Sequence, residues 1–260
     1  MKIYKFLHEG RARFGVLEDG GTVRAMRGSP FDGEMALGDE RWRLDALQLQ
    51  APTVERPRIF GVGFNYRSHI LETGRPLPDI PPLFMKPDTS LLAPGGAIVY
   101  PRGSTVVHYE AELVAVIGRR ARHVRQEDAL AHVLGYTCGN DVSERTIQRQ
   151  EMAMGLMTLG KAFDSFAPIG PCIETALDPG ALRLRGRLNG TQVQEGETAD
   201  LLFGVDALVA YLSRAVTLLP GDLIMTGTPA GVGPLRPGDR VEVEIEGIGT
   251  LANDVVEERA

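Results

Sequence analysis

Glycine and proline are spread along the whole chain and limit how long any regular element can be. The sequence holds 31 glycines and 17 prolines, and they punctuate turns rather than cluster in linkers. Short apolar runs lie between them, as at 59–63, 105–118 and 239–246. Helical periodicity is confined to the region of His69 and to 126–134, 144–154 and 204–212. The pattern predicts an α+β, mainly β fold and disfavours a doubly wound sheet, in which helices alternate with strands.

The first part of the chain is predicted to be a small β-containing domain. Apolar residues alternate around Ile3, Phe6 and Phe14, with a turn at 19–21, which is typical of a β-meander. We expect this domain to cover 1–57 and a larger domain to cover 58–260.

Charge and composition exclude several classes of protein. The 260-residue chain has 28 Lys and Arg against 34 Asp and Glu, a net charge of −6 with neutral His. An acidic chain without a basic run is a poor binder of nucleic acid. No apolar stretch reaches the ~18–20 residues of a membrane span, and the N-terminus does not resemble a secretory signal. Two cysteines, Cys138 and Cys172, suit a reducing compartment, so we expect a cytoplasmic protein.

The segment from Thr105 to Gly118 carries the sharpest chemical signal. Read as a strand, it is apolar on both faces, which predicts that it is covered on both sides. Glu110 and Glu112 project from the same face. Two buried neighbouring carboxylates repel each other unless a cation or a proton compensates them, and a hard divalent cation does so. The alternative is an edge strand whose Glu residues are only solvated.

Three further segments supply candidate partners. A strand is expected to end at Asn140, where Asp141 could complete a three-oxygen site or could cap the following helix; Ser143 is another candidate cap. Arg145 and Gln148 lie three apart and share a helix face.

His69 and Glu72 also lie three apart, and a carboxylate that holds an imidazole prepares it as a general base. Lys161 is the only charged residue between Glu151 and Asp164. It could stabilise an oxyanion or balance the carboxylates.

Together these segments resemble the fumarylacetoacetate hydrolase family from about Ile59 to the C-terminus. The resemblance rests on the following motifs, in chain order: Asn65-Tyr66-x-x-His69-x-x-Glu72, Lys86-Pro87, Tyr109-Glu110-x-Glu112, Asn140-Asp141-Val142-Ser143, Lys161-x-x-Asp164, Asn189-Gly190 and Thr226-Gly227-Thr228-Pro229. His108 departs from the Asp that many relatives carry before Tyr-Glu.

The resemblance implies a mixed β-sandwich roll, a homodimer and a Mg²⁺ or Mn²⁺ ion. The implied metal ligands are Glu110, Glu112 and Asp141. The implied catalytic residues are His69 and Glu72, on a mobile lid, and Lys161. The implied substrate-binding residues are Arg145, Gln148, Thr228 and, with less support from the motifs, Lys86.

The resemblance also implies a 2-oxo acid substrate and an enolate formed from it. We expect hydrolysis of a C–C bond in an acylpyruvate or fumarylpyruvate-like diketo acid, because both members of the water-activating dyad are present. One alternative is 2-hydroxyhepta-2,4-diene-1,7-dioate isomerase or oxaloacetate-type decarboxylase activity in aromatic catabolism. The other is a non-catalytic module that binds metal and ligand.

Overall fold

The segment that is apolar on both faces forms a central strand of the largest sheet. In the computed structural model, which describes residues 1–33 and 35–259, β11 (Ala111–Ile117) pairs antiparallel with β12 (Val133–Asn140) and β17 (Leu223–Met225). Every residue of β11 is buried. Leu113 belongs to one apolar cluster and Val114 to another, so alternate side chains enter two different cores. The prediction that both faces are covered is confirmed, and the edge-strand alternative is wrong.

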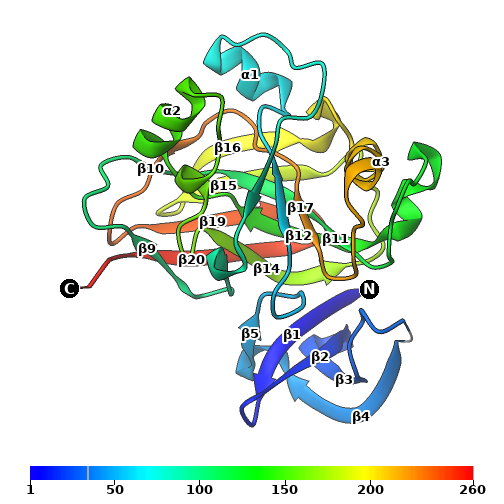
Figure 1. Cartoon of the computed structure of the whole chain (residues 1–260). Coiled ribbons are helices and arrows are strands. Elements are labelled where there is room, and N and C mark those ends of the chain that lie inside the picture. The colour runs from blue at the N-terminus through cyan, green and yellow to red at the C-terminus, as the bar shows by residue number, and fades with distance from the viewer. Residues whose placement is uncertain (34, 260) are drawn as a thin grey trace.

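The largest sheet runs in the order β4-β3-β2-β1-β14-β12-β11-β17-β6-β7, with β5 beside β1 and β8 beside β14 (Figure 1). Its other strands are β1 (Lys2–His8), β2 (Arg11–Glu18), β3 (Thr22–Arg27), β4 (Ala36–Arg43), β5 (Gln48–Gln50), β6 (Ile59–Val62), β7 (Leu83–Lys86), β8 (Leu91–Leu92) and β14 (Ala167–Glu174). Most neighbouring strands are antiparallel; β17 pairs parallel with β6, and β14 with β8.

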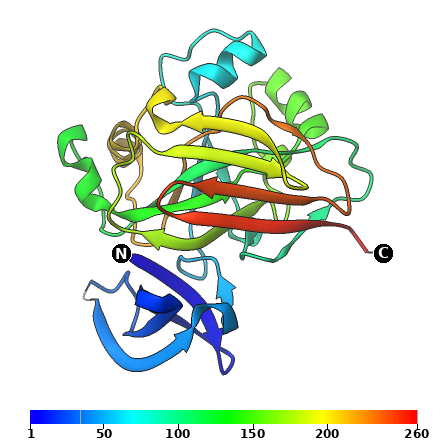
Figure 2. The ribbon, with the colours of Figure 1, turned by 180° about the vertical axis from the view of Figure 1, so that it is seen from behind.

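A second sheet packs against the first and makes the structure a β-sandwich. It has the order β16-β15-β19-β20-β9 and lies in front in Figure 2. Its strands are β9 (Ala97–Tyr100), β15 (Arg183–Leu188), β16 (Thr191–Glu197), β19 (Arg240–Ile245) and β20 (Gly249–Glu257). β15, β19 and β20 contact β11, β12 and β14 respectively. A third, small sheet joins β13 (Ser143–Glu144), β10 (Val107–Tyr109) and β18 (Gly233–Pro234).

Helices are few, as the sequence predicts. The α-helices are α1 (Arg67–Thr73), α2 (Arg145–Ala153) and α3 (Val205–Ala215). Short 3₁₀ helices are η1 (Asp19–Gly21), η2 (Leu44–Ala46), η3 (Asp88–Ser90), η4 (Gln126–His132), η5 (Leu159–Lys161) and η6 (Thr198–Asp200). The helix expected at 126–134 is therefore a 3₁₀ segment, which packs against α3. α1 and α2 lie at one end of the sandwich (Figure 1).

The N-terminal strands form a separate lobe that continues the main sheet. β1 to β4 are consecutive antiparallel neighbours, as a meander requires. β1 also pairs with β14, Ile3 opposite Ile173, which ties the lobe to the sandwich. Position 57 falls in the connection between β5 and β6. The mainly β, α+β fold is confirmed. No helix in the described part of the chain is both long and apolar enough to cross a membrane.

Candidate active site

Three carboxylates meet where two strands are interrupted. Glu110 stands in the break between β10 and β11, where its backbone N–H donates to Asn140 Oδ1 (2.9 Å). Asp141 follows β12, and its N–H donates to the Glu110 carbonyl (2.9 Å). Glu112 lies within β11 opposite Gly139. Carboxylate oxygens of the three residues lie within 4.8 Å of one another, and all three residues are buried.

Two lysines and an arginine hold two of these carboxylates. Lys161 Nζ donates to Glu110 and to Asp141, at 2.6 Å each. Lys86 Nζ donates to the other oxygen of Asp141 (2.5 Å). Arg145 donates to Glu110 (2.5 Å) and to Gln148 Oε1 (2.7 Å). Asp141 therefore binds lysines and does not cap α2.

Glu112 is the carboxylate of this group that forms no ion pair with the described residues. Its Oε2 accepts from the Gly227 N–H (2.8 Å). Burial raises the pKa of Glu112 well above its usual value, and Asp141 and Glu110 raise it further. A divalent cation held by oxygen ligands fits this donor set, because it would compensate the carboxylate that the lysines leave uncompensated.

The neighbouring charges keep Glu110 and Lys161 ionised. Burial raises the pKa of Glu110, but Arg145 and Lys161 outweigh it and bring that pKa below the usual range. Burial likewise lowers the pKa of Lys161, whereas Asp141 and Glu110 raise it above its ordinary value. Lys161 is therefore an ammonium ion, with three N–H donors of which two are used by carboxylates.

The residue that caps α2 differs from the one that the sequence predicts. Glu144, not Ser143, caps α2: its side chain accepts from the Ile147 N–H (2.6 Å). Ser143 instead donates to the Asp141 carbonyl (2.9 Å). The capping prediction for Ser143 is wrong because the β13 pairing carries the chain one residue further before α2 begins.

His69 and Glu72 share a face of α1, as their spacing predicts. His69 Nδ1 lies 3.3 Å from Glu72 Oε2, and the two ring planes of His69 and Phe64 are stacked. Glu72 also accepts from the Gly231 N–H. The start of α1 is anchored by the Asn65 amide, which donates to the Thr226 carbonyl (2.7 Å). The mobility of this segment stays a prediction.

Thr228 faces the site, but its hydroxyl hydrogen is already used. Thr228 Oγ1 donates to the Ala111 carbonyl and accepts from Gln194 Nε2, both at 2.9 Å. One lone pair of the hydroxyl remains for a ligand. No motif in the sequence marks Gln194, which is buried and orients Thr228 from β16.

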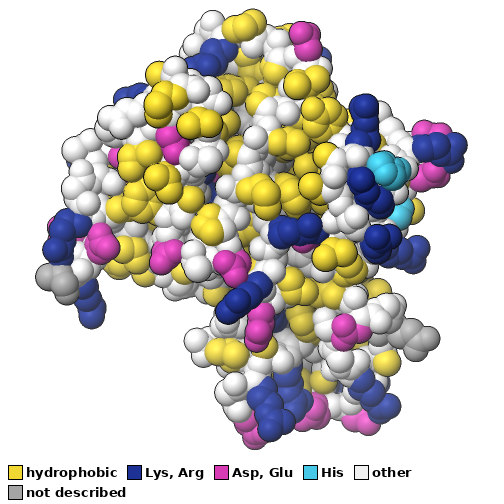
Figure 3. Space-filling view, in the orientation of Figure 1, with side chains coloured by type: hydrophobic (Ala, Val, Ile, Leu, Met, Phe, Trp, Pro, Cys, Tyr) yellow, Lys and Arg dark blue, Asp and Glu magenta, His cyan; other side chains and the backbone are white. Residues whose placement is uncertain are grey.

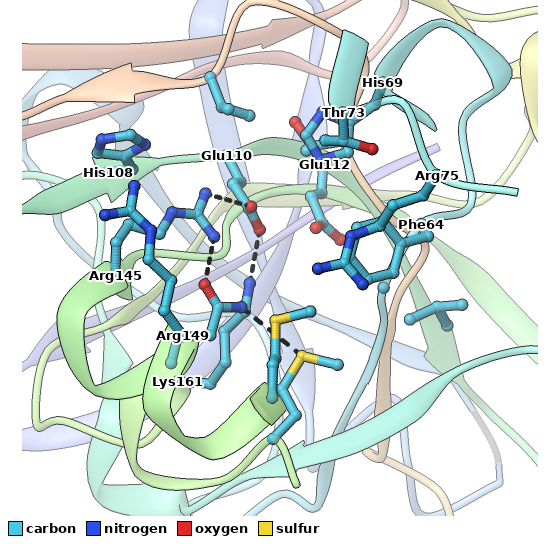
Figure 4. Close-up of a pocket in the computed structure, with 17 residues that line it drawn as sticks. Phe64, His69, Thr73, Arg75, His108, Glu110, Glu112, Arg145, Arg149 and Lys161 are labelled. Carbon is cyan, nitrogen blue, oxygen red and sulfur yellow. Dashed lines mark hydrogen bonds and ion pairs between the residues drawn. The ribbon is translucent and has the colours of Figure 1, made fainter. Parts of the chain in front are cut away.

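A pocket of about 330 Å³ opens onto these groups (Figure 4). Of the residues expected from the sequence, it is lined by His69, Glu110, Glu112, Arg145, Gln148, Lys161 and Thr228. Glu72, Lys86 and Asp141 are not among the lining residues. Glu72 contacts His69 and Asp141 contacts Lys161, which both line the pocket, and Lys86 contacts Asp141. The lining residues that sequence reasoning did not propose as site residues are Val62, Gly63, Phe64, Thr73, Arg75, His108, Arg149, Met152, Met157 and Val232.

Family models match nearly the whole chain. Residues 58–256 match the fumarylacetoacetate (FAA) hydrolase C-terminal family, and residues 1–52 match the Rv2993c-like, N-terminal family. The protein Rv2993c of Mycobacterium tuberculosis is 43% identical over 238 residues, 90% of this chain and 88% of the relative. Human mitochondrial oxaloacetate tautomerase FAHD2A is 40% identical over 216 residues, 79% of this chain and 68% of the relative.

Solved structures show the same fold. The 5-carboxymethyl-2-hydroxymuconate delta-isomerase of Mycobacterium smegmatis is 38% identical with a TM-score of 0.91, covering 99% of this chain and all of the other. Maleylpyruvate hydrolase of Sphingobium sp. SYK-6, in complex with manganese(II) and pyruvate, is 30% identical with a TM-score of 0.82 over the full length of both chains. This chain belongs to the fumarylacetoacetate hydrolase family.

Proposed function

We propose that this chain is a divalent-metal-dependent hydrolase that cleaves a C–C bond of an acylpyruvate or fumarylpyruvate-like diketo acid. The observation that carries the proposal is the convergence of His69, paired with Glu72, and Lys161 on one pocket that contains the carboxylates. A non-catalytic binding module would have no use for an oriented imidazole in the same pocket as a buried ammonium ion.

Glu110, Glu112 and Asp141 would hold the metal, Mg²⁺ or Mn²⁺. When bound, the ion would polarise the 2-oxo group as a Lewis acid. Manganese and pyruvate are present in the related maleylpyruvate hydrolase structure, and the uncompensated Glu112 favours a cation here.

The side chains around the carboxylates have distinct roles in this reaction. His69 Nδ1 is directed at Glu72, so Nε2 is the ring nitrogen that can act as a base. Nε2 takes a proton from a water molecule while the oxygen of that water forms a bond to the distal acyl carbon of the substrate. The electron pair of the broken C–C bond passes to the pyruvate part as an enolate, which is then protonated. The third N–H of Lys161 stabilises the enolate oxygen. Arg145, Gln148 and Thr228 orient the substrate from the pocket wall.

Isomerisation, tautomerisation or decarboxylation of a 2-oxo diacid is the second candidate. It uses the same enolate without an attacking water, and the similarity to the isomerase and to the oxaloacetate tautomerase favours it.

Substitution of the dyad separates the two candidates. With Mn²⁺, His69→Ala should abolish acetylpyruvate hydrolysis and retain metal affinity by calorimetry, while tautomerisation of oxaloacetate, if the wild type performs it, should survive. Lys161→Ala should lower every activity about 10²–10³-fold, as loss of an oxyanion donor does. If His69→Ala abolishes tautomerisation as well while metal stays bound, His69 serves a step common to both reactions and the isomerase-type candidate moves ahead.

We also propose that the protein is a homodimer. Large apolar side chains such as Leu71, Met154 and Leu159 are exposed on or near α1 and α2, and apolar side chains gather on the face shown in Figure 3. Sedimentation analysis that gives a single species of monomer mass would refute this.

A further inference from the structure

The charge of the pocket changes from its floor to its mouth. The acidic residues that line it are Glu110 and Glu112. Both are buried, and with Lys161 they form the floor of the pocket. The mouth of the pocket is formed by lining residues that reach solvent, and these include the exposed Arg75 and Arg149 and the half-buried His108. In Figure 4, His108, Arg145 and Arg149 lie on one side of Glu110, and Arg75 lies on the opposite side against Phe64.

Arg149 has no carboxylate partner in the described part of the chain. It follows Arg145 by one turn of α2, and like charges at this spacing destabilise a helix. The Arg145 charge is compensated by Glu110, which it contacts at 2.5 Å. No ion pair of the described residues includes Arg149, although it lines the pocket. Arg149 is thus a positive charge without a protein partner in the described part of the chain, one helical turn from a second arginine. Such an arginine can bind an anionic group of a ligand in the pocket.

His108 next to Arg149 also lacks a partner. Its Nδ1 is buried and makes no hydrogen bond within the described residues. Because Nδ1 is buried, Nε2 is the ring nitrogen that is available to form a hydrogen bond with a ligand in the pocket that His108 lines. β10 fixes the backbone that carries this ring, because His108 pairs with Ser143 on one side and Pro234 on the other.

We infer that His108 and Arg149 form a binding site for the second carboxylate of a dicarboxylic 2-oxo acid. The inference rests on the proposed function, which places the 2-oxo end of the substrate at the pocket floor. One helical turn, about 5.4 Å, separates Arg145, which reaches the floor, from Arg149. A substrate with its second carboxylate several bonds beyond the 2-oxo group spans this distance, and a short monocarboxylate does not use the site.

The test compares two ligands of equal length that have no acyl group to hydrolyse, 2-oxoadipate and 2-oxohexanoate. Calorimetry with Mn²⁺-loaded protein should give at least about tenfold tighter binding of 2-oxoadipate, since charge-assisted hydrogen bonds to Arg149 are available only to it. Arg149→Gln should remove this preference and leave 2-oxohexanoate binding within about twofold. Arg214→Gln, on α3 and outside the pocket lining, controls for the change in net charge.

Each other outcome overturns the assignment. Equal binding of the two ligands by the wild type would show that no second carboxylate site exists, while the 2-oxo acid function would stand. Loss of the preference in Arg75→Gln rather than Arg149→Gln would place the second carboxylate on the opposite wall. Binding of neither ligand would refute the proposed function and this inference with it.

Discussion

Glu151 joins the helix that carries Arg145 to the turn that presents Lys161. It lies in α2, is buried, and accepts four hydrogen bonds from the segment just before Lys161. Its Oε2 accepts from the N–H groups of Thr158 (3.0 Å) and Gly160 (3.1 Å). Its Oε1 accepts from the Leu159 N–H (2.7 Å) and from the Thr158 hydroxyl. Gly160 also packs closely against the Gln148 backbone of α2, and together with this packing the carboxylate should determine where Lys161 lies.

Glu151→Gln tests this role with almost no change in size. An amide has one accepting oxygen, so two of the four donors face an NH₂ group instead. The Thr158 hydroxyl can turn and accept from that NH₂ group, which leaves the Leu159 N–H without an acceptor. A buried donor left unsatisfied costs about 1–3 kcal/mol. Urea denaturation at pH 7 measures this loss, and the neighbouring exposed residue supplies the control, since Gln150→Ala should change stability by less than about 0.5 kcal/mol.

The pH dependence supplies a second readout of the same bonds. Burial raises the pKa of Glu151, but the hydrogen bonds from Thr158, Gly160 and Leu159 outweigh it and lower the pKa below 4.5. A carboxyl whose pKa is lowered by folding stabilises the protein above its unfolded pKa, and that contribution is lost as pH falls through the folded pKa. The difference in the free energy of unfolding between wild type and Glu151→Gln should therefore have its full value at pH 7 and decrease below pH 4.5. A difference under about 1 kcal/mol at pH 7, or one that does not fall with pH, would refute the reasoning.

Two predictions concern the buried charges. Glu112→Gln should leave the metal-free protein at least as stable as wild type, because it removes the carboxylate without a cation partner. It should also lose most of the rise in melting temperature on adding Mn²⁺, which in wild type corresponds to about 2.7 kcal/mol at 100 times the Kd; an undiminished rise would show that Glu112 is not a ligand. Lys86→Met should cost about 3 kcal/mol by urea denaturation, since it breaks a fully buried ion pair with Asp141. A loss below 1 kcal/mol would mean that Lys161 alone compensates Asp141.

The sequence predicts the local features of this protein because each feature depends on the spacing of residues within a single segment. The apolar character of both faces of β11 predicts its burial, and the spacing of His69 and Glu72 predicts their contact on α1. α2 and α3 coincide with the periodic stretches at 144–154 and 204–212. The motifs, read together, identify the family even though each motif taken alone is ambiguous.

The tertiary structure decides which segments meet, and this settles what spacing leaves open. From spacing alone, Asp141 could cap α2 or complete a three-carboxylate site with Glu110 and Glu112. In the structure Lys86 and Lys161, which come from distant parts of the chain, contact its carboxylate, and Glu144 caps α2 instead. Gln194 and Arg149 belong to no motif, and only the packing of β16 and α2 brings Gln194 to Thr228 and Arg149 to the pocket. Periodicity reports the faces of one element, whereas a site is made by side chains from several elements, and their juxtaposition depends on how the sheets pair and pack.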